Sequence, residues 1–186
     1  MGGDHMKNNK LDSLGTMVSL GFMSLGVYVI ASGDRFTDQW FDSGLFSAYY
    51  DTGADHGVHF NGNSSLHIQS RVPAPPGLGI IKKTLEPEKY LGRRICMSGH
   101  VKADGVKNWC GLWMRVDGPG TKILSFDCMK NRSISGTKDW EKYDIVLDVP
   151  SHSVNINYGL LLAGAGKVWA DAFAFKAFRA GGQQKQ

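Results

Sequence analysis

Hydrophobic and polar residues alternate in several short runs of this sequence, and this pattern constrains the fold more than any other feature. In the run Ser64–Ser70, Leu66 and Ile68 fall on one side, whereas His67 and Gln69 fall on the other. The same alternation occurs in three further runs, Ile95–Val101, Leu112–Asp117 and Tyr143–Val149. Successive side chains of a strand point to opposite faces of a sheet, so a period of two predicts half-buried antiparallel strands.

Glycine and proline residues separate these runs. Turn-forming residues occur at Asn61–Asn63, Asp104–Gly105, Asp117–Gly120 and Gly164–Gly166. Glycine allows the positive φ that such turns require, and the segment Pro73–Gly77 cannot lie inside a sheet because proline donates no ladder hydrogen bond. No long helix is predicted after Trp40, and short strands at this spacing favour a sandwich or a barrel.

Five stretches carry a resemblance to known proteins. They are YYDTGADHGVHFNGNSSLHIQS, YLGRRICMSGHVKADGV, GLWMRVDG, GTKDWEKYDIVLDVP and GKVWADAFAFKAF. They lie within Trp40–Phe178, and this part of the chain resembles the galactose-binding-like jelly rolls found in many carbohydrate-binding modules and in bacterial regulators. The resemblance implies an all-β fold, an antiparallel eight-strand jelly roll or β-barrel. It does not imply a particular ligand, because this fold has many functions.

An uncharged segment, Ser13–Gly33, precedes the strand pattern. It could be an export signal, a membrane span, or an apolar surface that packs against the rest of the protein. Its repeated glycine and serine residues lower its hydrophobicity and helix propensity, which disfavours the first two alternatives. We therefore expect a lid over the mouth of the β-barrel. The predicted division of the chain is a cloning scar (1–6), the N-terminal lid segment (7–35), the β-barrel or jelly-roll core (36–179) and a loose tail (180–186).

Composition narrows the class of partner. The chain of 186 residues has a net charge of +4, and its basic residues are scattered, so we expect no nucleic-acid partner. Cys96, Cys110 and Cys128 lack the CxxC spacing of zinc sites and are expected to be buried, reduced thiols. Reduced thiols favour a cytoplasmic location. No membrane partner is expected, and a homodimer is an open alternative.

Familiar catalytic motifs are missing from the sequence. We find no nucleophile elbow, phosphate-binding loop or HExxH motif. His56 and His59 flank a glycine turn near Asp51 and Asp55, which is either a polar loop or a metal site. The Asn-Pro-x-Phe-Glu opening that often helps to hold a structural calcium in the resembled domains is absent, so we expect no metal.

The polar faces of the predicted strands supply the candidate site residues. On these faces or next to them lie His67, Gln69, His100, Trp113, Arg115, Asp127 and Trp169. A tryptophan there can stack on a sugar or a polyene, or it can simply pack in the core. Arg115 can pair with Asp127, or it can bind an anionic ligand through two hydrogen bonds.

A small all-β body with an apolar N-terminal cap is also similar in architecture and size to the (4+2) cyclases, or Diels–Alderases, of spirotetramate and spirotetronate antibiotic biosynthesis. That resemblance implies cofactor-independent cyclisation of an apolar, linear polyene, accelerated by proximity and orientation inside the barrel. The expected catalytic residues are Gln69, His100 and Arg115, as hydrogen-bond donors to a carbonyl. The expected substrate-binding residues are Met17, Leu20, Phe22, Met23, His67, Trp113, Asp127 and Trp169. The alternative is a non-catalytic jelly-roll module that binds a carbohydrate or another small ligand.

Overall fold

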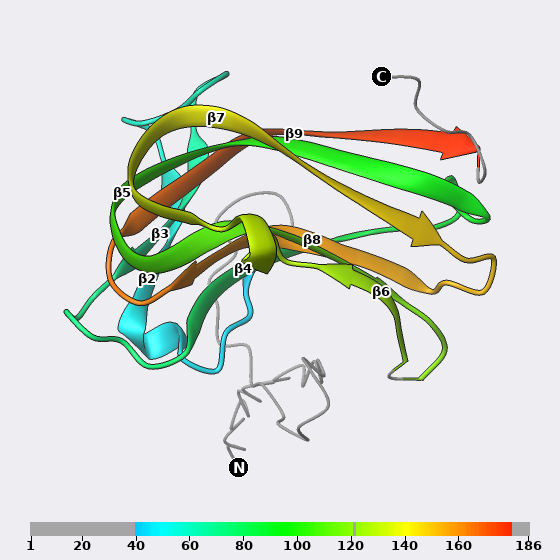
Figure 1. The fold of residues 1–186 in the computed structure, drawn as a ribbon, viewed down its shortest axis with the longest axis horizontal. Helices are drawn as coiled ribbons and strands as arrows, with labels where there is room; N and C mark the ends of the chain where they lie inside the picture. Colours follow the sequence, from blue (N-terminus) through cyan, green and yellow to red (C-terminus); the bar gives the residue numbers. More distant parts are fainter. Residues whose placement is uncertain (1–39, 121, 180–186) are drawn as a thin grey trace, which may run out of the picture.

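The computed structural model describes residues 40–120 and 122–179, which fold into β-strands joined by turns (Figure 1). The strands are β1 (Phe41–Asp42), β2 (Tyr50–Asp55), β3 (Ser65–Ser70), β4 (Leu78–Leu85), β5 (Arg93–Asp117), β6 (Ile123–Asp127), β7 (Ile134–Val149), β8 (Asn155–Ala163) and β9 (Lys167–Arg179). Two short 3-10 helices, Ser47–Tyr49 and Lys130–Arg132, complete the described elements. The all-β prediction is confirmed.

The predicted lid lies outside the described residues, and so do its candidate substrate-binding residues Met17, Leu20, Phe22 and Met23. The predicted scar and tail also lie outside them. In residues 40–120 and 122–179, no helix is long and apolar enough to cross a membrane.

All strand pairs are antiparallel, in the order β1-β4-β8-β5-β9-β3-β2, with β6 and β7 also paired to β5. The first half of β5 pairs with β9 and its second half pairs with β8. Figure 1 shows that β5 and β7 bend together at one side of the molecule. One sheet therefore contains β2, β3, β9, the first half of β5 and the part of β7 that pairs with it. The other contains β1, β4, β8, β6 and the second half of β5, which gives the nearly closed barrel of a jelly roll.

The bend in β5 replaces a predicted turn. Asp104–Gly105 was expected to separate two strands, but Ile95–Val101 and Leu112–Asp117 are the two ends of the single strand β5. Its pairing with β7 shifts register between Ala103 and Val106, and Gly105 has a φ of +59°. Because pairing continues on both sides of this glycine, the chain bends from one sheet to the other instead of reversing.

Side chains from both sheets meet in one hydrophobic cluster, which we call the inner cluster. It includes Ile68 of β3, Ile95 and Met97 of β5, and Leu160 of β8, each with no exposed surface. The predicted alternation is confirmed in β3, where Leu66 and Ile68 are buried while Gln69 is exposed. Filling of the space between the sheets by side chains argues against the hollow interior that the cyclase hypothesis requires.

Both faces of β5 are buried near its end. Leu112 and Met114 belong to the inner cluster, and Trp113, on the opposite face, is also fully buried. Trp113 belongs to a second cluster with Ile80, Trp109, Leu161 and Ala163, to which Leu78, Phe126 and Cys128 are added as partly buried neighbours. This sheet therefore has two apolar faces, although the alternation in Leu112–Asp117 predicted one.

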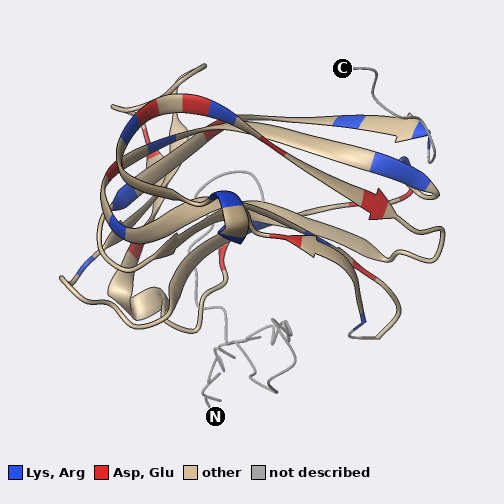
Figure 2. Ribbon diagram, viewed as in Figure 1, with Lys and Arg blue, Asp and Glu red and all other residues tan. Residues whose placement is uncertain are grey.

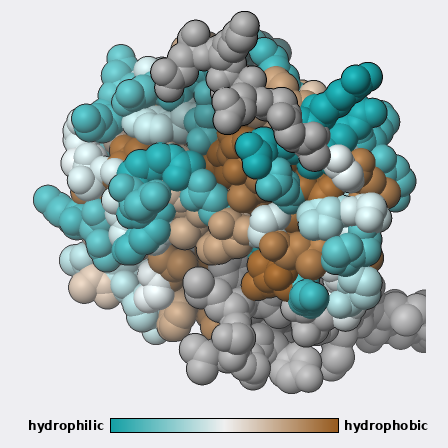
Figure 3. All heavy atoms as spheres, turned by 45° about the vertical axis from the view of Figure 1, so that its right-hand side comes forward, coloured by the Kyte–Doolittle hydropathy of each residue, from teal (hydrophilic) through white to brown (hydrophobic). Residues whose placement is uncertain are grey.

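The surface of the described part mixes charge and hydrophobic groups. Figure 2 shows Lys, Arg, Asp and Glu interspersed along the strands and loops. Figure 3, which brings the right-hand end of Figure 1 forward, shows hydrophobic patches between hydrophilic residues. All three cysteines are free: Cys110 is buried as predicted, whereas Cys96 and Cys128 are only half-buried. Burial raises the pKa of the Cys110 thiol to about 12, so it is protonated at neutral pH.

Candidate ligand-binding face

The side of β4, β8 and β5 that points away from the inner cluster forms four rows of directly paired residues. We call this surface the outer face. Its rows are Leu78–Ala163–Trp109, Ile80–Leu161–Gly111, Lys82–Gly159–Trp113 and Thr84–Asn157–Arg115. Directly paired residues of neighbouring strands point to the same side of a sheet. The first two rows form an apolar half of this face. The last two rows contain Lys82, Thr84, Asn157 and Arg115 and form its polar half.

Gly159 at the middle of the outer face makes room for Trp113. A Cβ atom added to Gly159 would lie 2.0 Å from the backbone oxygen of Ile81 and 3.2 Å from Nε1 of Trp113. The indole Nε1 donates a hydrogen bond to that same Ile81 oxygen at 3.2 Å. The indole thus reaches across β8 to β4. Trp113 was predicted to contact substrate, but in the structure its ring is fully buried and helps to hold the sheet together.

A chain of hydrogen bonds crosses the polar half from β4 to β5. Thr84 Oγ1 donates to Asn157 Oδ1 at 2.8 Å, and Asn157 Nδ2 donates to Asp117 Oδ2 at 2.7 Å. Arg115 contacts both oxygens of Asp117, through Nε at 2.7 Å and Nη2 at 2.9 Å. Asn157 is 2% exposed and Arg115 is 5% exposed. Asn157 and Arg115, the two buried members, are both fixed by hydrogen bonds or ion contacts to Asp117, which restricts their movement.

Lys82 lies beside this network and is 7% exposed. Among the described residues, no carboxylate forms an ion pair with its ammonium group. Burial, reinforced by the positive charge of Arg115, lowers the pKa of Lys82 from 10.5 to about 8. A buried lysine without a paired anion is uncommon, since desolvation of a charge is costly.

A groove borders the outer face beyond β6. It has a volume of about 530 Å³ and is lined by Phe126, Asp127, Cys128, Lys130, Asn131 and Leu147. Phe126 pairs with Arg115 across β5 and β6, and the Lys130 ammonium lies 4.3 Å from the ring centroid of Trp109. The groove is therefore joined to both halves of the outer face.

Asp127 fixes the wall of this groove and does not pair with Arg115, so that alternative of the sequence analysis is wrong. It is opposite Met114, on the other side of the strand from Arg115. Its carboxylate instead contacts Arg132 at 2.7 Å and accepts a hydrogen bond from the Met129 amide at 2.7 Å. Met129 has a φ of 59°, and this hydrogen bond supports a conformation that non-glycine residues seldom adopt.

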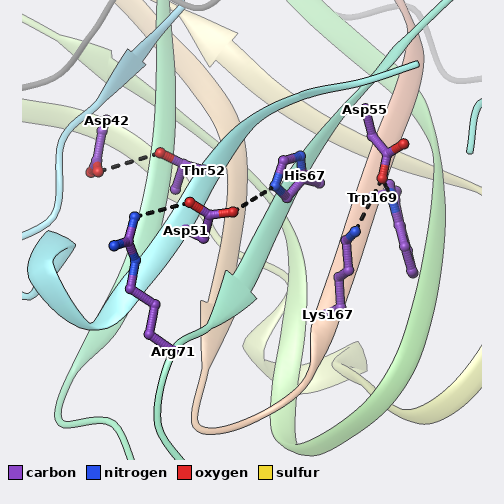
Figure 4. A network of polar contacts seen from close by, with 8 residues as sticks. All are labelled: Asp42, Asp51, Thr52, Asp55, His67, Arg71, Lys167 and Trp169. Atoms are coloured by element: carbon purple, nitrogen blue, oxygen red, sulfur yellow. Dashed lines mark hydrogen bonds and ion pairs between the residues drawn. The ribbon is translucent and has the colours of Figure 1, made fainter. Parts of the chain in front are cut away.

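Other predicted site residues lie on the second sheet (Figure 4). His67 of β3 pairs directly with Trp169 of β9, and Gln69 pairs with Lys167. Figure 4 shows Asp55 contacting both the Trp169 Nε1 atom, at 2.8 Å, and the Lys167 ammonium, at 3.1 Å. These hydrogen bonds, that from Trp169 above all, hold the pKa of Asp55 far below its usual value. The Trp169 ring is 6% exposed and lies under the Lys167 ammonium, 4.7 Å from it.

The remaining predicted residue, His100, lies on the same sheet, and its side chain packs against the loop between β2 and β3. Its ring stacks on Phe60, with centroids 3.8 Å apart and planes inclined by 12°. The amides of Phe60 and Asn61 both donate to Asp171 Oδ2, at 2.9 and 2.8 Å. Asp171 pairs with His100 across β9 and β5, so these contacts fix the loop after β2 over the sheet.

The structure therefore divides the residues predicted to act together. His67, Gln69, Trp169 and His100 lie on one sheet, whereas Trp113 and Arg115 lie on the outer face of the other. Gln69, His100 and Arg115 thus do not line one chamber. Sequence analysis missed Lys82 and Asn157, although Lys82–Lys83 inside the apolar run Leu78–Leu85 was a usable signal.

The described residues contain no group of three or more His, Cys, Asp or Glu side chains placed to hold a metal ion. The outer face, as defined by its four rows and Asp117, includes one carboxylate, which Arg115 and Asn157 occupy. Paired carboxylates for glycoside hydrolysis are therefore not formed there. At its edges the face offers the exposed Thr84 hydroxyl and the half-buried Phe126 ring, which suits binding of a small polar molecule.

Comparisons with known proteins support the fold. The xylan-binding CBM22-1 domain of Paenibacillus barcinonensis Xyn10C has a TM-score of 0.54 at 15% identity, over 81% of this chain and 92% of that one. The fold is a jelly roll of the carbohydrate-binding-module type. The CBM22-1–GH10 modules of Clostridium thermocellum Xyn10B, complexed with xylohexaose, give a TM-score of 0.52 at 14% identity, over 78% of this chain and 27% of that one. At such identities the likeness concerns the fold alone.

The sequence itself has a curated relative. It is 36% identical over 138 residues to the "Uncharacterized HTH-type transcriptional regulator YbfP" of Bacillus subtilis (strain 168). The match includes 74% of this chain and 47% of the relative, so the chain spans about half the length of that protein. No protein-family description matches the sequence.

Proposed function

We propose that this jelly roll is a non-catalytic binding module for a saccharide, and that the outer face of β4, β8 and β5 is its binding surface. The observation that carries the proposal is the hydrogen-bonded row Thr84–Asn157–Arg115, which adjoins Phe126, an aromatic residue on the wall of the open groove. Sugars present hydroxyl groups at their edges and apolar C–H faces. They are bound by polar side chains held rigidly next to aromatic surface.

The burial of this face has a consequence for binding. Asn157, Arg115 and Trp113 are each at most 5% exposed, whereas Thr84 at the end of the same row is exposed. The groove beside Phe126 is open as well. We therefore expect a ligand to enter from the Thr84 end or from the groove, and the contacts that shield the face to be exchanged for contacts with the ligand.

We prefer this proposal to a Diels–Alder cyclase for a physical reason. A polyene cyclase needs an apolar chamber that shapes its substrate. Here the inner cluster occupies the space between the sheets with packed side chains, and the expected catalytic donors lie on separate sheets. The similar folds named above are a xylan-binding domain and modules complexed with xylohexaose, and the sequence relative is named as a regulator; these favour binding over cyclisation.

A second part of the proposal concerns the setting of the module. A relative of 36% identity is named as an HTH-type transcriptional regulator and is about twice as long as the matched segment. We propose that such a module makes DNA binding by a longer protein dependent on a saccharide. A DNA-binding assay of the longer protein with and without the saccharide tests this part. An affinity for DNA that is the same in both conditions would refute it.

Calorimetric titration of the chain with a panel of oligosaccharides, xylohexaose among them, tests the binding function. Thr84→Val removes a hydroxyl at the exposed end of the polar row and should weaken binding about 3- to 10-fold, the usual effect of one hydrogen bond. Gln69→Ala, at an exposed position of the other sheet, is the matched control and should leave affinity unchanged. Equal affinity of both variants and wild type for every bound sugar would contradict the assignment of this face.

A further inference from the structure

Lys82 carries an inference about the ligand itself. It lies in the row Lys82–Gly159–Trp113, next to the row Thr84–Asn157–Arg115, and its side chain is on the same side of the sheet. It is more than nine-tenths buried. Within the described residues, its ammonium group makes neither a hydrogen bond nor an ion pair.

Among residues 40–120 and 122–179, the charges around Lys82 do not cancel. Arg115 and Asp117 form a two-point ion pair, and the second lone pair of Asp117 Oδ2 accepts from Asn157. The one carboxylate of the outer face is therefore already bound by its own strand neighbour and by β8. Asp117 attracts Lys82 only at longer range, so within the described part the Lys82 charge is in excess. Its side chain is largely buried, and an ionic hydrogen bond there is stronger than in bulk water.

We propose that the saccharide bound by the outer face carries a carboxylate, as uronic acids do, and that this group pairs with the Lys82 ammonium. The inference rests on the proposed function. A single excess positive charge matches a monoanion, which a uronate is, whereas a phosphate dianion would leave a buried negative charge. Thr84 and Asn157, in the next row, then face the hydroxyl groups that flank the carboxylate.

The direct test compares ligands that differ only in that group. The first pair is xylotriose with one glucuronic acid branch and its carboxyl-reduced form, and the second is trigalacturonate and its carboxyl-reduced form. In each pair that binds, the acid should bind about 10- to 100-fold more tightly by calorimetry at pH 7, as expected for a charge-assisted hydrogen bond. Equal affinity for acid and alcohol would overturn the inference.

Variants of the lysine assign the effect to this residue. Lys82→Met keeps the length of the side chain and should reduce the acid-to-alcohol ratio to about 1, while Lys82→Arg should keep most of it. Lys89→Met, at an exposed lysine outside the outer face, is the matched control and should keep the full ratio. Circular dichroism verifies that each variant is folded, and a ratio unchanged in folded Lys82→Met would refute the assignment.

The two proposals fail differently. If reduced and acidic ligands bind equally, and Thr84→Val weakens the binding of both, the outer face is supported as the binding surface. The proposed pairing of a ligand carboxylate with Lys82 is then wrong. If Thr84→Val and Lys82→Met leave every affinity unchanged, the outer face is not the binding surface, and both proposals fail.

Discussion

Replacing the buried lysine of the outer face should stabilise the fold, and the gain should depend on pH in a defined way. The ordinary lysine pKa of 10.5 and the folded-state pKa of about 8 for Lys82 differ by 2.5. At 1.36 kcal/mol for each pKa unit, this corresponds to an upper figure of about 3.4 kcal/mol. The remaining 7% exposure of the residue retains some hydration, so we expect roughly 2 kcal/mol.

The pH dependence follows from proton linkage. Because the folded pKa lies below the unfolded pKa, the unfolded chain binds more protons between about pH 8 and pH 10.5. The free energy of unfolding due to Lys82 therefore increases with pH in this window. The penalty is complete below pH 8 and vanishes above 10.5. Lys82→Met should be more stable than wild type by roughly 2 kcal/mol at pH 7, and about equally stable at pH 10.5.

Urea denaturation of wild type and Lys82→Met, followed by tryptophan fluorescence at pH 7, 9 and 10.5, measures this difference. Comparing the two proteins at each pH cancels the titration of other groups, such as Tyr158, whose pKa burial raises to about 12. Lys89→Met serves as the control and should match wild type throughout. A difference independent of pH, or a less stable Lys82→Met at pH 7, would refute the reasoning.

Three further predictions concern the rest of the chain. Gly159→Ala should destabilise the fold by about 3 kcal/mol or more, because its Cβ would lie 2.0 Å from the Ile81 oxygen. Gly57→Ala is the control: its Cβ would lie 3.5 Å from Asp55, and it should change the free energy of unfolding by less than about 0.5 kcal/mol. Similar urea midpoints for Gly159→Ala and Gly57→Ala would contradict the packing argument. Asp55→Asn should lose roughly 1–2 kcal/mol at pH 7 by thermal denaturation, since Asp55 accepts four hydrogen bonds. The folded pKa of Asp55 is lowered, so its contribution is present above the ordinary value of 3.8 and is lost as pH falls; a loss that persisted unchanged at pH 2 would be inconsistent with this. Deletion of residues 7–33 should leave oligosaccharide affinity within about threefold in calorimetry, provided that the variant folds, and a folded variant that no longer binds would show that the binding surface extends to this segment.

The sequence predicted the strands whose two faces have different surroundings. In β3, Leu66 and Ile68 are buried against the inner cluster and Gln69 is exposed, as the alternation indicated. The turn Gly164–Gly166 was also predicted, and it joins β8 to β9. Both results depend on local information, because side-chain direction and positive φ are properties of a few adjacent residues.

The outer face could not be predicted in the same way. Its rows join β4, β8 and β5, so Lys82, Gly159 and Trp113 meet although 31 or more residues separate them in the sequence. Alternation in Leu112–Asp117 predicts one buried face and one polar face, whereas both faces of this part of β5 are buried. The absence of an Arg115–Asp127 pair shows the same limit, since the register between β5 and β6 places Asp127 opposite Met114. The actual partner, Asp117, lies two residues along the same strand and therefore on the same face as Arg115.

The most direct test of the binding face is a nuclear magnetic resonance titration of the isotope-labelled chain with the tightest oligosaccharide of the panel. We predict that the amide shifts that change most belong to β4 and β8 around Lys82 and Asn157, and to β5 around Arg115. Changes confined to β3 and β9, around His67 and Trp169, would contradict the account and place the ligand on the opposite sheet.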